Sequence, residues 1–360
     1  MNKILYISGA VLPSKYANSV HVMKMCQALA KINTEVTLTA RGSDNLDIYK
    51  FYNVKKNFKV IKTKHIKNSA LRFLKYNYLC FKLIKNHDGV VFLRYFYPLI
   101  WCILFKKKVI LEFHGVTNSK IISFLISKVF KSDKFIMAIF ITEKLKEKYI
   151  EKFKIPVKKC IVLADCADLP DKIIENTNVK EVGYVGHLYE GRGVEMIIDI
   201  AKVLKDTNFH IIGGLEKDIE KYKSISPPNM KFYGFITQGE LSEVYGKFSI
   251  ALAPYQNKVG IGKLGVDTSK WMSPMKAFEY MSYKKAIIIS NLPVLKEIGE
   301  DKFHFLYVAP DDPNEWIEAI VSLQNDKDFL NKLRNHSYEH FLRNFTWDGR
   351  AARIIEFTQN

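Results

Sequence analysis

Short apolar runs alternate with helical segments along the whole chain, and this alternation constrains the fold more than any other feature. Runs of strand length separated by helices are typical of parallel sheets built from β-α-β units. A first series predicts strands at Lys3–Ser8, Glu35–Thr39, Val90–Arg94, Lys108–Phe113 and Lys134–Ile141. A second series predicts strands at Glu181–Gly186, Phe209–Ile212, Met230–Phe235, Ser249–Ala253, Ala286–Ile289 and His304–Val308. Two such series predict an α/β chain with two doubly wound, Rossmann-like domains.

Helices and a boundary follow from the same pattern. We expect helices at Ser19–Lys31, Glu143–Phe153, Val194–Lys205, Gly239–Tyr245 and from Ser273 onward. A chain of 360 residues is long enough for two domains. A polar stretch near Asp165–Asn178 interrupts the pattern, so we expect domains at residues 1–168 and 178–343, followed by a terminal helix at 344–360.

Cysteine usage and hydrophobicity indicate the compartment. The five cysteines are scattered and form no CxxC pair, which favours reduced thiols and argues against zinc. The first residues begin a strand at once, so we expect no signal peptide. The most apolar run, Val90–Phe105, contains Arg94 and Pro98 and is shorter than a spanning helix, which needs roughly 20 residues. We therefore expect a cytoplasmic protein, with a buried strand and a short helix in that run.

The net charge of +18 is concentrated in the first half of the chain. Residues 1–178 contain 32 Lys and Arg against 13 Asp and Glu, whereas residues 179–360 are almost balanced. Residues 48–87 contain eleven basic residues, no acidic ones and several aromatic ones. Such a surface suits anionic lipid headgroups. A lysine-rich composition without a function is the second interpretation, and nucleic-acid binding is the third, which no nucleic-acid motif supports.

The segment Ser273-Pro-Met-Lys-Ala-Phe-Glu-Tyr-Met281 predicts a helix that begins at an anion. Ser273 suits the N-cap and Pro274 the first helical position. The free N–H groups of that helix end, including Met275, and the charge of Lys276 would bind a diphosphate. Glu279 would then accept hydrogen bonds from a ribose. An ordinary capped surface helix is the alternative interpretation.

Other loops at strand ends carry candidate binding residues. Gly9 opens a long polar loop that leads to a helix capped by Asn18 or Ser19, and a glycine there permits close approach of a ligand. His114 follows a strand end, although a lone histidine is more often structural. In the second half, Arg192 stands between Gly191 and Gly193 immediately before a helix, a suitable place for a guanidinium that binds a diphosphate.

Two motif matches are misleading. Gly260–Gly265 matches GxGxxG, but no strand precedes it directly and no helix follows, so we expect a loop over the donor pocket rather than a dinucleotide site. Asp165 and Asp168 resemble a metal-binding pair, but we interpret them as part of the interdomain connection.

Taken together, these motifs resemble the GT-B retaining glycosyltransferases of family 4 over nearly the whole chain. The matching pieces are Pro13–Val22, Glu112–Gly115, Val185–Gly193, Tyr233–Phe235, Ser273–Met281 and Phe345–Asp348. The resemblance implies two Rossmann-like domains facing a cleft, with the acceptor on the basic N-terminal domain and a nucleotide sugar on the C-terminal domain. It also implies that the terminal helix crosses back onto the first domain.

The resemblance implies roles for particular residues. Arg192 and His187 would bind the donor diphosphate, Glu279 the ribose, and His114 would lie near the reacting sugar. The donor-binding set is Gly9, His187, Arg192, Ser273, Met275, Lys276 and Glu279, and the catalytic set is His114, Arg192 and Lys276. The acceptor would meet Tyr16, Asn18, Ser19 and Arg94. The chain departs from the family at Trp271, where a first Glu usually touches the transferred sugar, and at Ala17-Asn18, which replaces a Gly-Gly pair.

We therefore expect a metal-independent transferase without a cofactor that moves a sugar, with retention, from a UDP- or GDP-type donor to a glycan or lipid-linked acceptor. Arg192, Lys276 and the helix dipole would stabilise the departing diphosphate. The expected setting is cell-surface polysaccharide or glycolipid assembly, at the inner face of the cell membrane and without nucleic acid. A non-catalytic binding protein of the same shape and a sugar-nucleotide epimerase are the alternatives.

Overall fold

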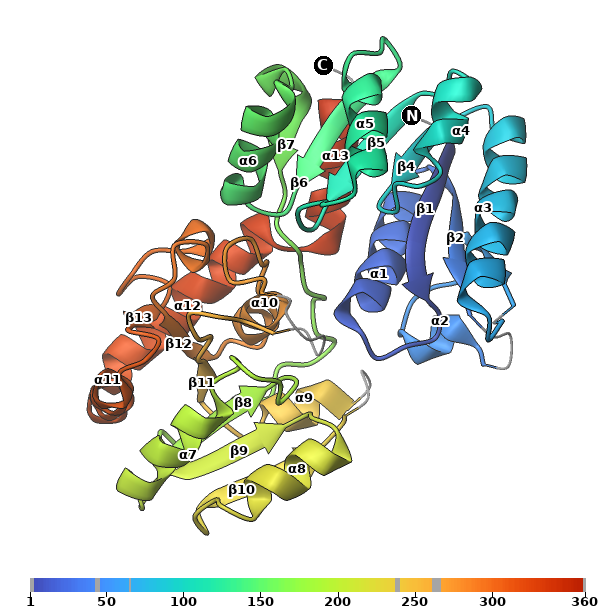
Figure 1. Ribbon diagram of the computed structural model, residues 1–360. Coiled ribbons are helices and arrows are strands. Elements are labelled where there is room, and N and C mark those ends of the chain that lie inside the picture. Colours follow the sequence, from blue (N-terminus) through green and yellow to red (C-terminus); the bar gives the residue numbers. More distant parts are fainter. Residues whose placement is uncertain (1–2, 43–45, 65, 237–239, 261–266, 359–360) are drawn as a thin grey trace. The chain divides into compact units, whose positions relative to one another are not determined.

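The computed structural model describes residues 3–42, 46–64, 66–236, 240–260 and 267–358, which form two compact units (Figure 1). Unit 1 contains the residues up to Ala164 together with those from Trp347 onward. Unit 2 contains Asp165–Thr346. The chain therefore leaves unit 1 once and returns to it for its last helix.

Within the described residues, unit 1 contains a seven-stranded parallel sheet in the order β3-β2-β1-β4-β5-β6-β7. Its strands are β1 (Lys3–Val11), β2 (Glu35–Arg41), β3 (Lys59–Thr63), β4 (Val90–Leu93), β5 (Val109–Phe113), β6 (Phe135–Phe140) and β7 (Cys160–Val162). The strand order reverses between β1 and β4, and the carboxyl ends at such a point are where doubly wound sheets bind ligands.

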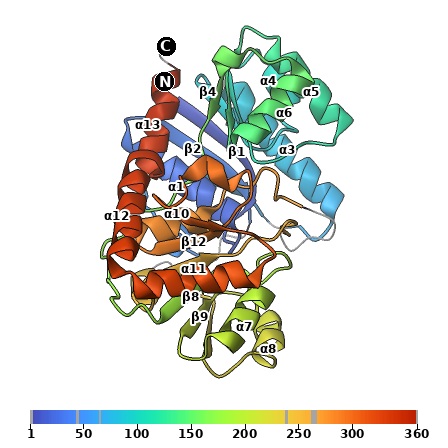
Figure 2. The same ribbon diagram turned by 90° about the vertical axis from the view of Figure 1, so that its left-hand side faces the viewer.

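Helices cover both faces of this sheet. They are α1 (Ala17–Lys31), α2 (Ile48–Phe51), α3 (Ser69–Asn86), α4 (Leu99–Leu104), α5 (Lys120–Phe130), α6 (Glu143–Phe153), a 3-10 turn at Val157–Lys159 and the terminal α13 (Trp347–Phe357). Figure 2 shows α1 and α13 on one face and α3, α4 and α5 on the other, and α13 packs directly on α1. Side-chain caps define several starts: Asn68 caps α3, Ser119 caps α5 and Thr142 caps α6.

Unit 2 contains a six-stranded parallel sheet in the described residues, in the order β10-β9-β8-β11-β12-β13. Its strands are β8 (Glu181–Val185), β9 (Asn208–Ile212), β10 (Met230–Gly234), β11 (Ile250–Ala253), β12 (Ala286–Ser290) and β13 (Leu306–Val308). Its helices are α7 (Val194–Val203), α8 (Glu216–Lys223), α9 (Leu241–Tyr245), α10 (Met275–Ser282), a 3-10 turn at Leu295–Ile298, α11 (Pro313–Asn325) and α12 (Lys327–Asn344). Here the order reverses between β8 and β11.

The two predicted Rossmann-like sheets are confirmed, because their central strands are continuous apolar runs buried on both faces. The strand and short helix expected in Val90–Phe105 are β4 and α4. The sequence pattern missed β3, α3 and α5. The first of these is short, and the two helices carry exposed apolar residues that obscure their periodicity. Gly239, the expected start of a helix, lies outside the described residues.

Near the first loop, the predicted end of the first strand and the predicted start of the first helix are both wrong. β1 continues to Val11, so Gly9 lies inside the strand rather than after it. α1 begins at Ala17, and neither Asn18 nor Ser19 caps it. The described residues contain no helix that is both long and apolar enough to cross a membrane. All five cysteines are free thiols.

Candidate functional site

The strands at the reversal point of unit 2 separate toward their carboxyl ends. β8 and β11 pair only through Val182 and Gly183. Beyond them, the hydroxyl of Tyr280 on α10 accepts a hydrogen bond from Val185 N at 2.8 Å and lies 3.2 Å from the Leu252 carbonyl oxygen. Tyr280 thereby fixes α10 beside the ends of both strands, and places its first residues at the position where ligands of such sheets bind.

Gly191 and Gly193 allow the loop after β11 to approach the loop after β8. Both have positive φ angles, 79° and 75°. A Cβ on Gly191 would lie 1.9 Å from the Lys258 carbonyl oxygen, and a Cβ on Gly193 would lie 2.1 Å from that of Pro254. Side chains at these positions would therefore push the two loops apart. The glycines that the sequence pattern singled out serve this close approach, which holds Arg192 between the loops.

Arg192 is anchored but incompletely hydrogen-bonded. Its guanidinium lies 5.3 Å from the ring centroid of Tyr255, and Nη2 donates to the Gly260 carbonyl at 3.3 Å. Its Nε is buried and has no hydrogen-bond partner among the described residues. A buried guanidinium N–H without an acceptor costs free energy that an anionic ligand recovers. Arg192 is therefore ready to bind an anion.

His187 and Lys276 lie close to this guanidinium. Burial lowers the pKa of His187, and the nearby charges of Lys276 and Arg192 lower it further. The ring stacks on Tyr189, with 4.7 Å between the centroids, and its lowered pKa favours the neutral form. Three nitrogen-bearing side chains thus gather beside the end of β8. An anion bound among them would raise the pKa of His187 again.

Glu279 is already paired with two donors. Lys276 Nζ lies 2.7 Å from Glu279 Oε2, and the Tyr245 hydroxyl donates to the same oxygen at 2.7 Å. Among the described residues no hydrogen bond reaches the other oxygen, Oε1. Lys276 and Glu279 do share one face of α10, as their spacing predicts. Lys276 would have to divide its charge between Glu279 and a bound diphosphate.

The predicted cap of α10 is wrong. The helix begins at Met275 after Pro274, and no side chain caps it. The Ser273 hydroxyl instead accepts a hydrogen bond from Asp165 N at 2.8 Å, so it fixes the first residue of unit 2. Met275 N donates to the Ser273 carbonyl, and Ala277 N donates to that of Pro274. The helix end therefore offers fewer free N–H groups than the sequence pattern indicated.

The loop after β11 is closed at its base. Thr268 N donates to the Val259 carbonyl at 3.0 Å, and Asp267 accepts hydrogen bonds from Val259 N and Ser269 N. Most of the GxGxxG match, residues 261–265, lies outside the described residues, so its predicted role over the donor pocket stays a prediction. Trp271 follows this closure, and its N donates to the Thr268 carbonyl.

Unit 1 contains a buried carboxylate that the sequence pattern did not single out. Glu112 in β5 is fully buried, and its carboxylate accepts hydrogen bonds from Arg350 Nη2 at 2.6 Å and from the Tyr6 hydroxyl at 2.7 Å. Burial alone would raise the pKa of Glu112, but Arg350 and two neighbouring histidines hold it well below its usual range. A single glutamate inside the apolar run Val109–Phe113 was the sequence signal that could have pointed to Glu112.

His114 connects this carboxylate to Arg94. His114 Nε2 lies 3.5 Å from Glu112 Oε1, and Arg94 Nη2 lies 3.1 Å from His114 Nδ1. A guanidinium has donors only, so Nδ1 accepts and the ring proton is on Nε2, directed at Glu112. Nδ1 is thus occupied by Arg94, and Nε2 faces the Glu112 carboxylate. Arg94 Nη1 is buried without a hydrogen-bond partner among the described residues. Arg94 therefore has a donor available for a ligand.

The donor set around Glu112 does not suit a metal ion. Among the described residues, His21, Glu112 and His114 form one group whose ligand atoms lie within 4.8 Å of one another. Arg350 occupies the carboxylate oxygen that a cation would need, and its own positive charge opposes a second cation there. We interpret the group as a buried charge network.

The other residues predicted at the first loop lie in β1 and at the start of α1. The Gly9 carbonyl accepts a hydrogen bond from Arg41 Nε at 3.0 Å. Ser19 is buried, with its hydroxyl 2.6 Å from that of Ser14, so it closes the loop rather than facing a ligand. Tyr16 is exposed, and Asn18 lies in the first turn of α1.

Comparisons with known proteins agree with this architecture. Residues 179–326 match the family model for group 1 glycosyl transferases. An uncharacterized glycosyltransferase of Methanocaldococcus jannaschii is 29% identical over 168 residues, which are 46% of this chain and 44% of that protein. The chain thus aligns with less than half the length of that relative.

Solved structures match the whole chain. A glycosyltransferase from Rickettsia africae gives a TM-score of 0.76 at 13% identity, covering 99% of this chain and 98% of that one. Anabaena HepE, solved with UDP and glucose, gives 0.73 at 10% identity and covers both chains completely. Sucrose-phosphate synthase from Thermosynechococcus elongatus gives 0.73 at 14% identity, covering 100% and 98%.

This chain has the GT-B fold. The segment of the GT-B chain that matches the family model includes His187, Arg192, Lys276 and Glu279. The Glu112 network of unit 1 lies outside that segment.

Proposed function

We propose that this GT-B protein is a glycosyltransferase that uses a nucleoside diphosphate sugar. The observation that carries the proposal is the gathering of Arg192, His187 and Lys276 at the reversal point of unit 2. Arg192 supplies a buried donor that has no acceptor within the described part of the chain, which fits a diphosphate. The solved structure of HepE with UDP and glucose supports a nucleotide-sugar donor of the UDP type, and a GDP-type donor is the other candidate.

Unit 2 then binds the donor. Arg192 and Lys276 stabilise negative charge on the departing diphosphate, while Glu279 Oε1 accepts from the ribose. His187 adds a donor that gains a proton as the anion binds. Preorganised cations of this kind supply the largest electrostatic contribution to transfer. They also make a metal ion unnecessary for leaving-group stabilisation, and we propose a metal-independent reaction without a cofactor.

Unit 1 binds the acceptor, which we propose is a glycan or a lipid-linked glycan in cell-surface assembly. Arg94 is the residue we place nearest to it. The reaction retains the anomeric configuration by attack on the leaving-group face. The Glu112 carboxylate does not serve as a covalent nucleophile, because it is fully buried and bound by Arg350. The protein acts in the cytoplasm, at the inner face of the cell membrane.

Donor turnover tests this proposal. The full-length protein is incubated with UDP- and GDP-sugars, and release of the nucleoside diphosphate is measured. We expect one donor to be hydrolysed slowly and Arg192→Ala to lower that rate at least tenfold, an estimate from about 1.5 kcal/mol for one charged hydrogen bond. Arg343→Ala is the matched control, because that side chain is 74% exposed and forms a surface ion pair with Glu339.

Two results would overturn the proposal. A protein that binds UDP or GDP without turnover in the presence of glycan acceptors is a binding protein of the same shape. A protein that returns the nucleotide sugar with inverted configuration at one sugar carbon is an epimerase. NMR of the transferred product then distinguishes retention from inversion at the anomeric carbon.

A further inference from the structure

Helices α4 and α5 expose an unusual set of apolar side chains on one face of unit 1. The two helices pack against each other, on the sheet face opposite to α1 and α13 (Figure 2). Their exposed large apolar residues are Ile100, Ile103, Leu104, Ile121 and Phe124, with exposed fractions of 40–69%. We call these residues the α4–α5 face. Exposed apolar side chains grouped on two packed helices often mark an interaction site.

The α4–α5 face contributes nothing to the core of unit 1. The core side of α5 is formed by Ile122, Leu125, Ile126, Val129 and Phe130, all of which are buried. Ile121 and Phe124 point the opposite way, and they continue along the helix to Lys128, whose Nζ lies 5.6 Å from the centroid of the Phe124 ring. Stability of the fold therefore does not explain these exposed apolar side chains.

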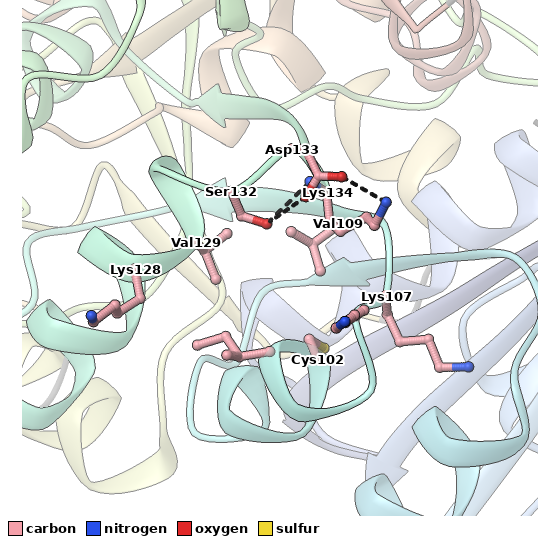
Figure 3. Close-up of a pocket in the computed structure, with 10 residues that line it drawn as sticks. Cys102, Lys107, Val109, Lys128, Val129, Ser132, Asp133 and Lys134 are labelled. Atoms are coloured by element: carbon pink, nitrogen blue, oxygen red, sulfur yellow. Dashed lines mark hydrogen bonds and ion pairs between the residues drawn. The ribbon is translucent and has the colours of Figure 1, made fainter.

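A basic pocket lies beside this face. Its volume is about 380 Å³, and it sits at the amino ends of β5 and β6 (Figure 3). Four lysines and one aspartate contribute to its lining: Lys106, Lys107, Lys128, Lys134 and Asp133. Lys134 is paired with Asp133 at 2.7 Å, and Lys107 donates to the His87 carbonyl. Lys107 keeps its positive charge, because a carbonyl oxygen is neutral, and Lys106 and Lys128 are exposed and add two further positive charges.

We propose that the α4–α5 face docks on an anionic lipid bilayer and that the lysine pocket binds the phosphate of a lipid headgroup. Lysine ammonium groups attract acidic headgroups, while the aliphatic and aromatic side chains beside them enter the boundary with the acyl chains. The inference deepens the proposed function and rests on it for its purpose, because a lipid-linked acceptor is reached at a membrane.

The charges and side-chain types favour a bilayer over other partners. Four of the five apolar residues are aliphatic and cannot stack on nucleic-acid bases, which prefer aromatic or guanidinium planes. A second copy of this chain would bring the same lysines together, and like charges oppose that contact. α5 runs from the loop that begins at His114, on the proposed acceptor side, to the pocket at the amino ends of β5 and β6.

The location differs from the one that the composition indicated. Of the aromatic residues in the basic segment 48–87, Tyr52, Phe58 and Tyr76 are buried in the core of unit 1. They cannot meet a lipid headgroup. Phe73 and Tyr78 on α3 remain exposed, but the lysine pocket belongs to α4, α5 and the strands behind them.

Vesicle flotation of the full-length protein tests the inference. We expect flotation with vesicles of phosphatidylglycerol in phosphatidylcholine at low salt, and none with phosphatidylcholine alone. Lys106→Asn combined with Lys128→Ala should weaken binding by about fivefold per lysine. Asparagine is chosen at position 106 because that residue has a positive φ of 47°, which asparagine tolerates. Ile121→Ser combined with Phe124→Ser should abolish the binding that persists at high salt.

Matched controls come from unit 2. Lys217→Ala with Lys223→Ala removes two exposed lysines of α8, and Val203→Ser with Ile225→Ser removes two exposed apolar residues. Both control proteins should float as the unchanged protein does. Circular dichroism and thermal unfolding establish that every variant is folded.

Several results would overturn the inference. They are absence of flotation with the anionic vesicles, equal flotation of the α4–α5 variants, and binding of single-stranded RNA in place of vesicles. Self-association that Phe124→Ser abolishes would identify a second copy as the partner instead. Donor hydrolysis measured without vesicles reports on the transferase alone. Flotation with no hydrolysis therefore refutes the proposed function while the docking surface stands, and hydrolysis without flotation does the reverse.

Discussion

The guanidinium of Arg350 lies 2.6 Å from the carboxylate of Glu112, although 238 residues separate them in the chain. Both side chains are fully buried. The same guanidinium donates through Nε to the Ala164 carbonyl at 3.0 Å, so one side chain joins the last helix to β5 and to the end of the first unit. The strand that carries Glu112 ends immediately before His114. The ion pair between Arg350 and Glu112 therefore holds in place the strand that leads to the proposed acceptor side.

Removing either partner of this pair should strongly destabilise unit 1. Arg350→Met leaves a buried carboxylate without its cation, and breaking a buried pair in this way costs about 3–5 kcal/mol. We expect a large drop in the denaturation midpoint of Arg350→Met. Lys31→Ala is the control, because Lys31 and Asp348 form an exposed ion pair between α1 and α13, the helix that carries Arg350. That change should cost less than about 1 kcal/mol. Equal costs for the two variants would contradict the assignment.

Gly191→Ala should disrupt the Arg192 loop. The new Cβ would lie 1.9 Å from a backbone oxygen of the facing loop, so the loops must separate. We expect loss of donor binding, measured as loss of the thermal shift that the nucleoside diphosphate gives. Gly234→Ala is the control: its φ is also positive, at 71°, but the nearest atom to its Cβ is 3.8 Å away. Undiminished donor binding by Gly191→Ala would refute the role of this close approach.

His114 should act by positioning Arg94 rather than as a proton acceptor. Its Nδ1 accepts from Arg94, and its Nε2 lies 3.5 Å from Glu112 Oε1. We expect His114→Gln to lower kcat while the shape of the pH–rate profile stays unchanged. Arg94→Ala should raise the KM for the acceptor and leave the KM for the donor unaltered. Loss of an acidic limb from the pH–rate profile in His114→Gln would instead identify the ring as a base.

Glu279→Gln should weaken binding of the nucleotide sugar, although the substitution has two opposing effects. It reduces the acceptor strength offered to the ribose, but it also releases Lys276 from its 2.7 Å ion pair. We expect a higher KM for the nucleotide sugar and a smaller effect, or none, on the Kd for inorganic diphosphate. Tyr245→Phe, which removes the other donor to Oε2, is the matched control and should change both constants little. An unchanged KM in Glu279→Gln would refute the ribose assignment.

The buried Lys285 should make unit 2 more stable as pH rises above 7. Burial, followed by the charge of Arg334, lowers the pKa of Lys285 to about 7, while Glu175 acts in the opposite direction. In the unfolded chain the pKa is about 10.4. Between these values the unfolded chain binds more protons, so the free energy of unfolding increases with pH and is flat below about pH 7.

Denaturant unfolding at pH 7, 8 and 9 measures this effect. The increase should be smaller in Lys285→Met than in the unchanged protein. Lys270→Met, at an exposed position, should keep the full increase. A Lys285→Met protein with the same pH dependence as the unchanged one would show that the ammonium titrates normally.

The sequence predicted the two sheets because buried parallel strands such as Ala286–Ser290 are written as continuous apolar runs. It also placed Arg192, between two glycines, immediately before a helix, and α7 does begin at Val194. It failed at Ser273, where a hydroxyl suited to an N-cap bonds instead to the distant Asp165 N. It gave no role to Glu112 or Arg350: the charge inside the run Val109–Phe113 was a signal for Glu112, but nothing local identifies Arg350 as its distant partner. Tertiary partners, rather than local preferences, decided each of these cases.

The return of the last helix to unit 1 has a consequence for synthesis on the ribosome. The strands that surround Glu112 are all translated before Arg350, so the first unit emerges with an uncompensated carboxylate at its centre. Its core cannot reach its final state until the C-terminal residues have left the ribosome. A chain truncated before Arg350 would contain every strand of both sheets and still carry a defect that proteases recognise. Folding of the first unit therefore depends on translation of the helix that carries Arg350.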